Sequence, residues 1–298
     1  MKHRILVAMM AAAATVAVVP LVPVRASGQA PAGGSWTPPR LPDGQPDMQG
    51  IWIADAVGAA HSVEDGREIE SDIIQGRVGE RNPIVIVDPA DGRIPYLPAP
   101  AARRRELLEG MFTPTKMEHI DTHVRNLLDG VPRNIYVPGG VQIGQVPGLV
   151  VMLYESNHAY RAIPMDGRPH VGERVKLWMG DSRGRWEGNT LVVDVTNFNE
   201  GTWFDAHATF HSDALHVVER WTMASADRID YTVTIEDPKV FAKPWKMAIA
   251  INRNKEKGYE QWEDAKHEGD RDVENILMTG RLEKAAGRSG IHEHHRER

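Results

Sequence analysis

Two residues with complementary acid–base chemistry, Glu155 and His158, lie close together in the chain. Ser156-Asn157 between them has the composition of a tight turn, and apolar runs flank the segment on both sides. A two-residue turn would place Glu155 directly opposite His158, on a strand face that also carries Val151, Leu153 and Tyr160. A carboxylate beside an imidazole on an apolar face is suited to general acid–base catalysis. The alternative is a cross-strand ion pair with a structural role alone.

Other polar side chains lie on predicted loops that follow this hairpin. Arg168 and His170 come after the turn signal Asp166-Gly167, and such loops often carry binding residues. The alternative is that both side chains hydrogen-bond to loop carbonyls. Asp181, with Arg183 nearby, lies between two tryptophan-bearing segments, which predicts either part of a site or a pinned turn.

Two arginines and one histidine complete the candidate set. Arg161 and Arg220 lie on predicted strands, where a guanidinium could stabilise negative charge developing on a substrate. A solvated outer strand face is the alternative reading of such polar positions. His267 stands among acidic residues after the last predicted strand. The acid–base hypothesis assigns catalysis to Glu155, His158, His267 and Asp181, and substrate binding to Arg161, Arg168, His170, Arg220 and Tyr160.

The sequence argues against metal and thiol chemistry. It contains no cysteine, which excludes disulfides, thiolate nucleophiles and cysteine zinc sites. His119 and His123 have helical spacing, and His207 and His211 repeat it, but neither pair has an identifiable third ligand. We therefore expect no bound metal and no other cofactor.

The first 26 residues have the order of a signal peptide. Basic residues near the start precede an uncharged apolar stretch, and Val24-Arg25-Ala26 matches the preference of signal peptidase. We expect cleavage after Ala26, with Gly28-Gln29-Ala30 as a second possible site, and hence a periplasmic or secreted protein. An uncleaved membrane anchor is the alternative.

The charge of the chain limits its partners. Cleavage after Ala26 removes three basic residues, which changes the formal net charge from −6 to −9. No basic patch with interleaved aromatic residues occurs. We therefore expect no nucleic-acid partner and no stable membrane insertion after cleavage, and we expect a small organic molecule as ligand or substrate.

Hydrophobic periodicity predicts a mainly β fold. Helical patterns occupy residues 99–111 and 116–129. After Val131-Pro132 the pattern changes to a period of two, with turn signals such as Pro147-Gly148 and Gly188-Asn189 between the runs. The predicted strands are residues 140–146, 149–155, 158–164, 174–179, 190–196, 215–223, 228–236, 245–252 and 258–263.

Short strands at this spacing predict an antiparallel barrel or sandwich with an N-terminal extended arm and one or two short helices. The strand layout is similar to a lipocalin-type barrel, an analogy of fold that carries no function. The chain divides into a signal peptide at 1–26, an extended Pro/Gly-rich arm with short helices at 27–132, an antiparallel β domain at 133–284 and a disordered tail at 285–298.

Several motifs resemble a large family of exported bacterial proteins with no assigned activity. They cover most of the mature chain and include Pro42–Asp47, Asp91–Tyr96, Tyr136–Gly140, Leu153–Glu155, Ile163–His170 (IPMDGRPH), Trp178–Gly188 (WMGDSRGRWEG), Thr190–Asp194 (TLVVD), His216–Arg220 (HVVER), Glu236–Pro238, Pro244-Trp245 and His267–Gly269 (HEG). Members of the family often have a cysteine before the last motif, where this chain has Lys266. The resemblance implies export and supplies no activity.

Three functions remain open at this point. The first is metal-independent acid–base catalysis, such as elimination, isomerisation or hydrolysis, by a lyase, isomerase or hydrolase. The second is non-catalytic binding of a small ligand, and the third is a structural or partner-binding module of the cell envelope. Convergence of the candidate residues in one concavity would favour an enzyme, a deep apolar cavity would favour a binding protein, and a filled core would favour the module.

Overall fold

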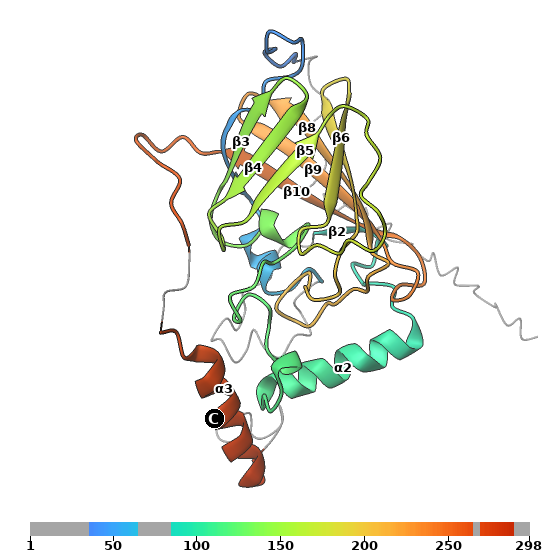
Figure 1. Ribbon diagram of the computed structural model, residues 1–298, viewed down its shortest axis with the longest axis vertical. Coiled ribbons are helices and arrows are strands. Elements are labelled where there is room, and N and C mark those ends of the chain that lie inside the picture. The colour runs from blue at the N-terminus through green and yellow to red at the C-terminus, as the bar shows by residue number, and fades with distance from the viewer. Residues whose placement is uncertain (1–35, 65–84, 265–268, 289–298) are drawn as a thin grey trace, which may run out of the picture.

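The computed structural model describes residues 36–64, 85–264 and 269–288. Ten strands form one antiparallel sheet in the order β5-β4-β3-β1-β10-β9-β8-β7-β6, with β2 paired to β10. The sheet curls until β5 and β6 lie beside each other, which gives a nearly closed barrel (Figure 1). The predicted mainly β, antiparallel barrel is confirmed. Its strands are β1 (Gly50–Ala54), β2 (Ile86–Asp88), β3 (Val141–Val146), β4 (Leu149–Tyr154), β5 (Tyr160–Pro164), β6 (Asp181–Glu187), β7 (Thr190–Thr196), β8 (His216–Ser225), β9 (Arg228–Glu236) and β10 (Trp245–Arg253).

Large side chains fill the inside of the barrel. Alternate residues of each strand point inward, so the period of two in the sequence becomes an inner and an outer face. Trp221 of β8 and Tyr231 of β9 are cross-strand partners with ring centroids 4.7 Å apart, and both are fully buried. Trp52 of β1 and Trp245 of β10 belong to the same core. The described interior is therefore a packed core.

No backbone hydrogen bonds of the sheet join β5 to β6. Side chains make the contacts between these two strands. Arg161 of β5 donates a 3.0 Å hydrogen bond to Ser182 of β6. Gly184 of β6 faces Met165, and a Cβ atom at Gly184 would lie 2.3 Å from the Met165 sulfur. A residue without a side chain is therefore needed for the close approach at this point.

Most predicted strands are confirmed, but two are wrong. Residues 174–179 form part of the loop between β5 and β6, and residues 258–263 form an irregular segment. Apolar and polar residues alternate over only part of 174–179 and do not alternate at 258–263, and neither segment pairs as part of the sheet. Three strands, β1, β2 and β6, were not predicted. Because β1 and β2 belong to the sheet, part of the expected arm at 27–132 lies in the barrel.

The predicted helix at 116–129 is absent apart from the short 3-10 helix η3 (Met117–His119). The Asp121 carboxylate accepts a hydrogen bond from the backbone N–H of His123, and Arg133 forms two 2.7 Å bonds with the same carboxylate. Asn126 has a φ of +59°, which interrupts a helix. These side-chain contacts replace helical hydrogen bonds, so His119 and His123 do not share a helix face.

Two α-helices of the described residues lie outside the barrel (Figure 1). Helix α2 (Pro98–Phe112) confirms the pattern at 99–111, and α3 (Asp272–Ala285) was missed. Two further 3-10 helices, η1 (Val57–Ala60) and η4 (Arg133–Ile135), lie between the strands along the chain. Within the described ranges, no helix has the length and hydrophobicity needed to cross a membrane. The predicted signal peptide, His267 and most of the predicted tail lie outside the described residues.

Candidate functional site

The β4–β5 hairpin turns one residue later than the sequence analysis expected. Ala159 donates a 3.1 Å hydrogen bond to the Ser156 carbonyl, and the two residues between them, Asn157 and His158, have φ values of +54° and +52°. Positive φ at both central residues is typical of a type I′ turn. His158 therefore belongs to the turn and does not face Glu155, so the predicted direct pair of these two residues is wrong.

The two faces of this hairpin are also the reverse of the hypothesis. Tyr154 and Arg161 point into the barrel, whereas Leu153 and Tyr160 lie on the outside as a directly opposed pair. Both faces of the hairpin are rich in apolar residues, so hydrophobicity did not distinguish them. Tyr160 is 67% exposed and is available to a ligand only from the outer surface.

Glu155 is fully buried at the end of β4 and is bound through both carboxylate oxygens. Oε2 accepts a 2.6 Å hydrogen bond from the backbone N–H of Gly140, and Oε1 accepts one of 2.6 Å from the Tyr259 hydroxyl. Within the described part of the chain, no basic side chain pairs with this carboxylate. Burial and the hydrogen bond to Glu155 raise the pKa of Tyr259. The phenol is therefore a proton donor that Glu155 holds in place.

Tyr259 belongs to a segment that crosses the outside of the hairpin. Gln261 donates a 2.7 Å hydrogen bond to the Leu153 carbonyl. Asp264 then joins the hairpin through its backbone, donating to the Glu155 carbonyl at 2.8 Å and accepting from Asn157 at 2.9 Å. These three contacts fix the segment against the end of β4.

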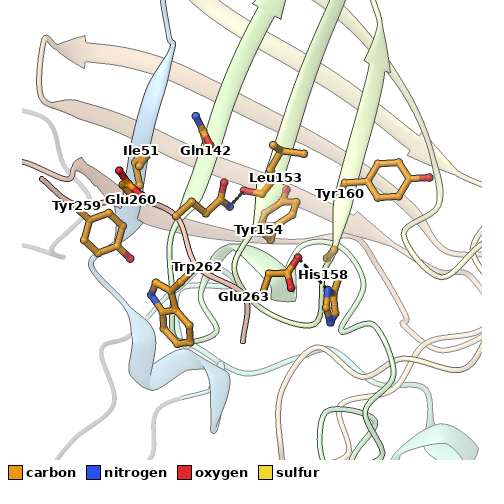
Figure 2. A pocket seen from close by; sticks show the side chains of 12 residues that line it. Ile51, Gln142, Leu153, Tyr154, His158, Tyr160, Tyr259, Glu260, Trp262 and Glu263 are labelled. Carbon is orange, nitrogen blue, oxygen red and sulfur yellow. Dashed lines mark hydrogen bonds and ion pairs between the residues drawn. The ribbon is translucent and has the colours of Figure 1, made fainter. Parts of the chain in front are cut away.

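An open groove of about 610 Å³ lies between this segment and the barrel surface (Figure 2). His158 is at its lower edge, where its Nδ1 atom lies 3.5 Å from an oxygen of Glu263. Trp262 and Tyr259 form an aromatic wall on the crossing segment. The full lining is Ile51, Gln142, Leu153, Tyr154, His158, Ala159, Tyr160, Tyr259, Glu260, Gln261, Trp262 and Glu263.

A second group of predicted residues meets on the outer face of β6, β7 and β8. The two ring nitrogens of His170 lie 2.9 Å from Asp181 and 2.9 Å from Asp194. His216 reaches the other oxygen of Asp194 at 3.0 Å, and Arg183 binds Asp181 at 2.7 Å. Both ring nitrogens of His170 therefore have a carboxylate partner, which fixes the ring between Asp181 and Asp194.

Charge interactions in this second group shift the pKa values of two members. The hydrogen bond to Asp194 raises the pKa of His216, against the opposing effect of burial. The hydrogen bond from His216, and then that from His170, lowers the pKa of Asp194. These contacts attach the loop between β5 and β6 to the barrel, which gives Asp181 and His170 a structural role. The group of His170, Asp181, Arg183, Asp194 and His216 is called the clasp below.

The three predicted substrate-binding arginines already have partners. Arg161 is inside the barrel, where Glu219 binds its guanidinium, so a ligand at the surface cannot reach it. Arg168 binds Asp166 of its own turn. Arg220 binds Glu187 at 2.8 Å on the outer surface. None of the three lines the groove.

The predicted residues therefore do not converge as the acid–base hypothesis required. His158 and Tyr160 line the groove, and Glu155 lies behind it through Tyr259. Asp181 and His170 belong to the separate clasp. The groove residues that the sequence analysis missed are mainly those of the segment 259–263, where an isolated tryptophan among charged residues was the available signal.

The histidines considered for metal binding have other partners in the structure. His123 binds the buried carboxylate of Asp129, whereas the His119 ring packs close to Gly110. His211 lies 2.6 Å from the Thr202 hydroxyl. Among the described residues, no group of three or more His, Asp or Glu side chains is placed to hold a metal ion. Metal independence stays a prediction.

Comparison with models of known protein families gives no match, and a search among curated proteins gives no significant match either. The resemblance to a family of exported bacterial proteins therefore stays an expectation that rests on the sequence motifs.

Proposed function

We propose that this chain is an exported protein that binds a small organic molecule in the groove between the segment 259–263 and the β4–β5 hairpin. The observation that carries the proposal is Trp262, which is 53% exposed within this hollow. An exposed indole leaves a large apolar surface in water, and such surfaces mark binding sites when polar groups surround them. Gln142 supplies hydrogen-bonding groups in the same lining, and Gln261 adds its carboxamide oxygen, since its N–H₂ group donates to Leu153.

The size of the groove suits a small ligand. Ligand pockets typically measure about 300–1,000 Å³, and this groove of about 610 Å³ lies within that range. Because core side chains fill the described barrel interior, the proposed ligand binds on the outer surface. A filled core favours the module among the three open functions, and the groove is what supports binding of a small molecule in addition to a scaffold role.

The export part of the proposal rests on the order of basic, apolar and small residues in the first 26 positions. N-terminal sequencing of the protein from its native host should find a mature chain that begins at Ser27 or close to it. A mature cytoplasmic chain that begins at Met1 would refute export.

The binding part is tested by recording two-dimensional NMR spectra during titration with a library of small fragments. Bound fragments should shift the indole resonance of Trp262 and the backbone resonances of residues 259–263. The variant Trp262→Leu should weaken this binding, while Arg220→Gln, on the outer surface away from the groove lining, should leave it unchanged. A library that perturbs none of the groove resonances would contradict the proposal.

Catalysis at the same groove is the second candidate. It is favoured by the 2.6 Å hydrogen bond that the Tyr259 hydroxyl donates to Glu155, which fixes the phenol oxygen at the groove as an acceptor, with a carboxylate behind it that can take the phenol proton. If a bound fragment is turned over, Tyr259→Phe should abolish turnover and retain binding. Full turnover in that variant would remove Tyr259, and Glu155 with it, from the catalytic list.

A further inference from the structure

Among the described residues, the groove carries acidic groups and no basic side chain other than His158. Glu260 and Glu263 line it, and the described lining contains no lysine and no arginine. His158 is already within 3.5 Å of Glu263, and both side chains are exposed, so this contact is a weak surface pair. The charge complementary to this lining is positive.

The same segment that brings the acids also brings the aromatic rings. Tyr259 and Trp262 alternate with Glu260 and Glu263 along the chain, and Figure 2 shows the two rings on the same side of the groove. Tyr160 lies across the groove with its ring directed away from Trp262. The Tyr259 hydroxyl is bound to Glu155, which fixes this ring in the lining. Aromatic faces beside carboxylates attract cations through the ring quadrupole and through direct charge.

We propose that the groove selects organic cations, meaning an ammonium group carried on a small apolar frame. The ammonium group lies against Trp262 and Glu263, and the apolar frame contacts Leu153. This inference rests on the proposed function, because it names the class of molecule that the groove binds. Anionic ligands are excluded by Glu260 and Glu263 unless a counter-charge comes with them.

Three molecules of matched shape separate charge from shape. Choline carries a trimethylammonium group, 3,3-dimethylbutan-1-ol carries the neutral tert-butyl equivalent, and 3,3-dimethylbutanoate combines the tert-butyl group with a carboxylate. We expect choline to bind roughly two- to fivefold more tightly than the alcohol, the range for a cation over an exposed aromatic ring, and the carboxylate to bind most weakly. The titrations are followed at low ionic strength through the backbone resonances of residues 259–263, which every variant retains, and added salt should reduce the choline preference.

Variants locate the source of the preference. Glu263→Gln should weaken choline binding by up to about fivefold and leave the alcohol unchanged. Glu173→Gln is the matched control, because Glu173 is an exposed acid on the loop between β5 and β6 and is not part of the lining. Trp262→Leu should weaken both ligands, and Trp262→Tyr should restore the choline preference.

The outcomes distinguish failure of the cation preference from failure of small-molecule binding itself. Equal binding of choline and the alcohol, or tighter binding of the carboxylate, would overturn the cation inference while leaving a groove that binds small molecules. If the fragment library and all three matched molecules leave the groove resonances unchanged, the proposed function itself fails. A choline preference that survives Glu263→Gln, Glu260→Gln and Trp262→Leu would place the cation site elsewhere and also overturn the inference.

Discussion

Replacing Arg161 with methionine should destabilise the barrel by about 3–5 kcal/mol, because it leaves a buried carboxylate without its cation. The Arg161 and Glu219 side chains are 1% and 0% exposed, and the guanidinium contacts both carboxylate oxygens. Tyr231 also donates a 2.9 Å hydrogen bond to Glu219. In Arg161→Met this hydroxyl is the one partner that remains for Glu219, and Ser182 of β6 loses its contact across the seam.

The double variant separates the ion pair from the packing of its two stems. Glu219→Met alone should also cost about 3–5 kcal/mol, because it leaves an unpaired buried guanidinium. Arg161→Met combined with Glu219→Met removes both charges and fills the space with apolar groups, which is often tolerated. The hydroxyls of Tyr231 and Ser182 would then each lack a partner, at about 1–3 kcal/mol apiece. The single losses sum to about 6–10 kcal/mol and the double variant should lose about 2–6 kcal/mol, so at mid-range it should lose about 4 kcal/mol less than the sum.

Urea unfolding followed by tryptophan fluorescence measures these free energies of unfolding. Native domains are typically stable by about 5–15 kcal/mol, so a single variant retains a folded baseline when the wild-type stability exceeds the expected loss of about 3–5 kcal/mol. Arg168→Met is the control, because Arg168 is exposed and binds its own turn, and it should change stability by under about 0.5 kcal/mol. A folded Arg161→Met variant that loses less than 1 kcal/mol, or strict additivity in the double variant, would refute a strongly coupled buried pair.

Three further outcomes test the clasp, one close approach and the buried carboxylate. Because Asp194 raises the pKa of His216, this pair should stabilise the fold fully below about pH 6.5, and the stabilisation should be lost as pH rises through the raised pKa of His216. The melting temperatures of wild type and His216→Gln should therefore converge at alkaline pH. A difference in melting temperature that stays constant with pH would contradict this. Gly180→Ala should lose about 1–3 kcal/mol in urea unfolding, because its Cβ would lie within 3 Å of two side chains at a φ of +65°, whereas Gly188→Ala, with φ +64° and open space, should lose distinctly less; equal losses would refute the packing explanation. Glu155→Gln should cost about 1–3 kcal/mol, because an amide N–H₂ would face one of two bound donors, and an unchanged unfolding midpoint would show that the carboxylate is not held as described.

The strand pattern was predictable because alternation and turn residues agree along the second half of the chain. Residues 190–196 and 228–236 were predicted with their observed bounds, since the first is a β-branched apolar run that follows a turn signal and the second alternates polar and apolar residues. The prediction of a helix at 116–129 was wrong because hydrophobic periodicity does not report contacts between side chains far apart in the sequence. Asp121 binds Arg133, which lies beyond the predicted helix, and this contact competes with helical backbone bonds.

Which face of the β4–β5 hairpin is buried could not be read from hydrophobicity. Leu153 and Tyr160 suggested an inner face, but Arg161 decides the matter through Glu219, which lies 58 residues away in the sequence. A charged residue in an apolar strand is normally assigned to the outside. Only the knowledge of a partner on β8 would have placed Arg161 in the core, and one sequence does not provide that partner.

Glu155, which the sequence indicated as a site residue, binds Tyr259 of the segment 259–263, which the sequence did not indicate. Its burial and its two hydrogen bonds explain why an acid is found at the end of β4. Both of its oxygens are occupied by donors that the fold supplies, so a substrate cannot reach the carboxylate without displacing Tyr259. Glu155 therefore acts on the groove through Tyr259, as a positioning residue. The barrel provides a rigid edge and Glu155 fixes the crossing segment to it. In the proposed function, the ligand contacts Tyr259, Trp262 and their acidic neighbours.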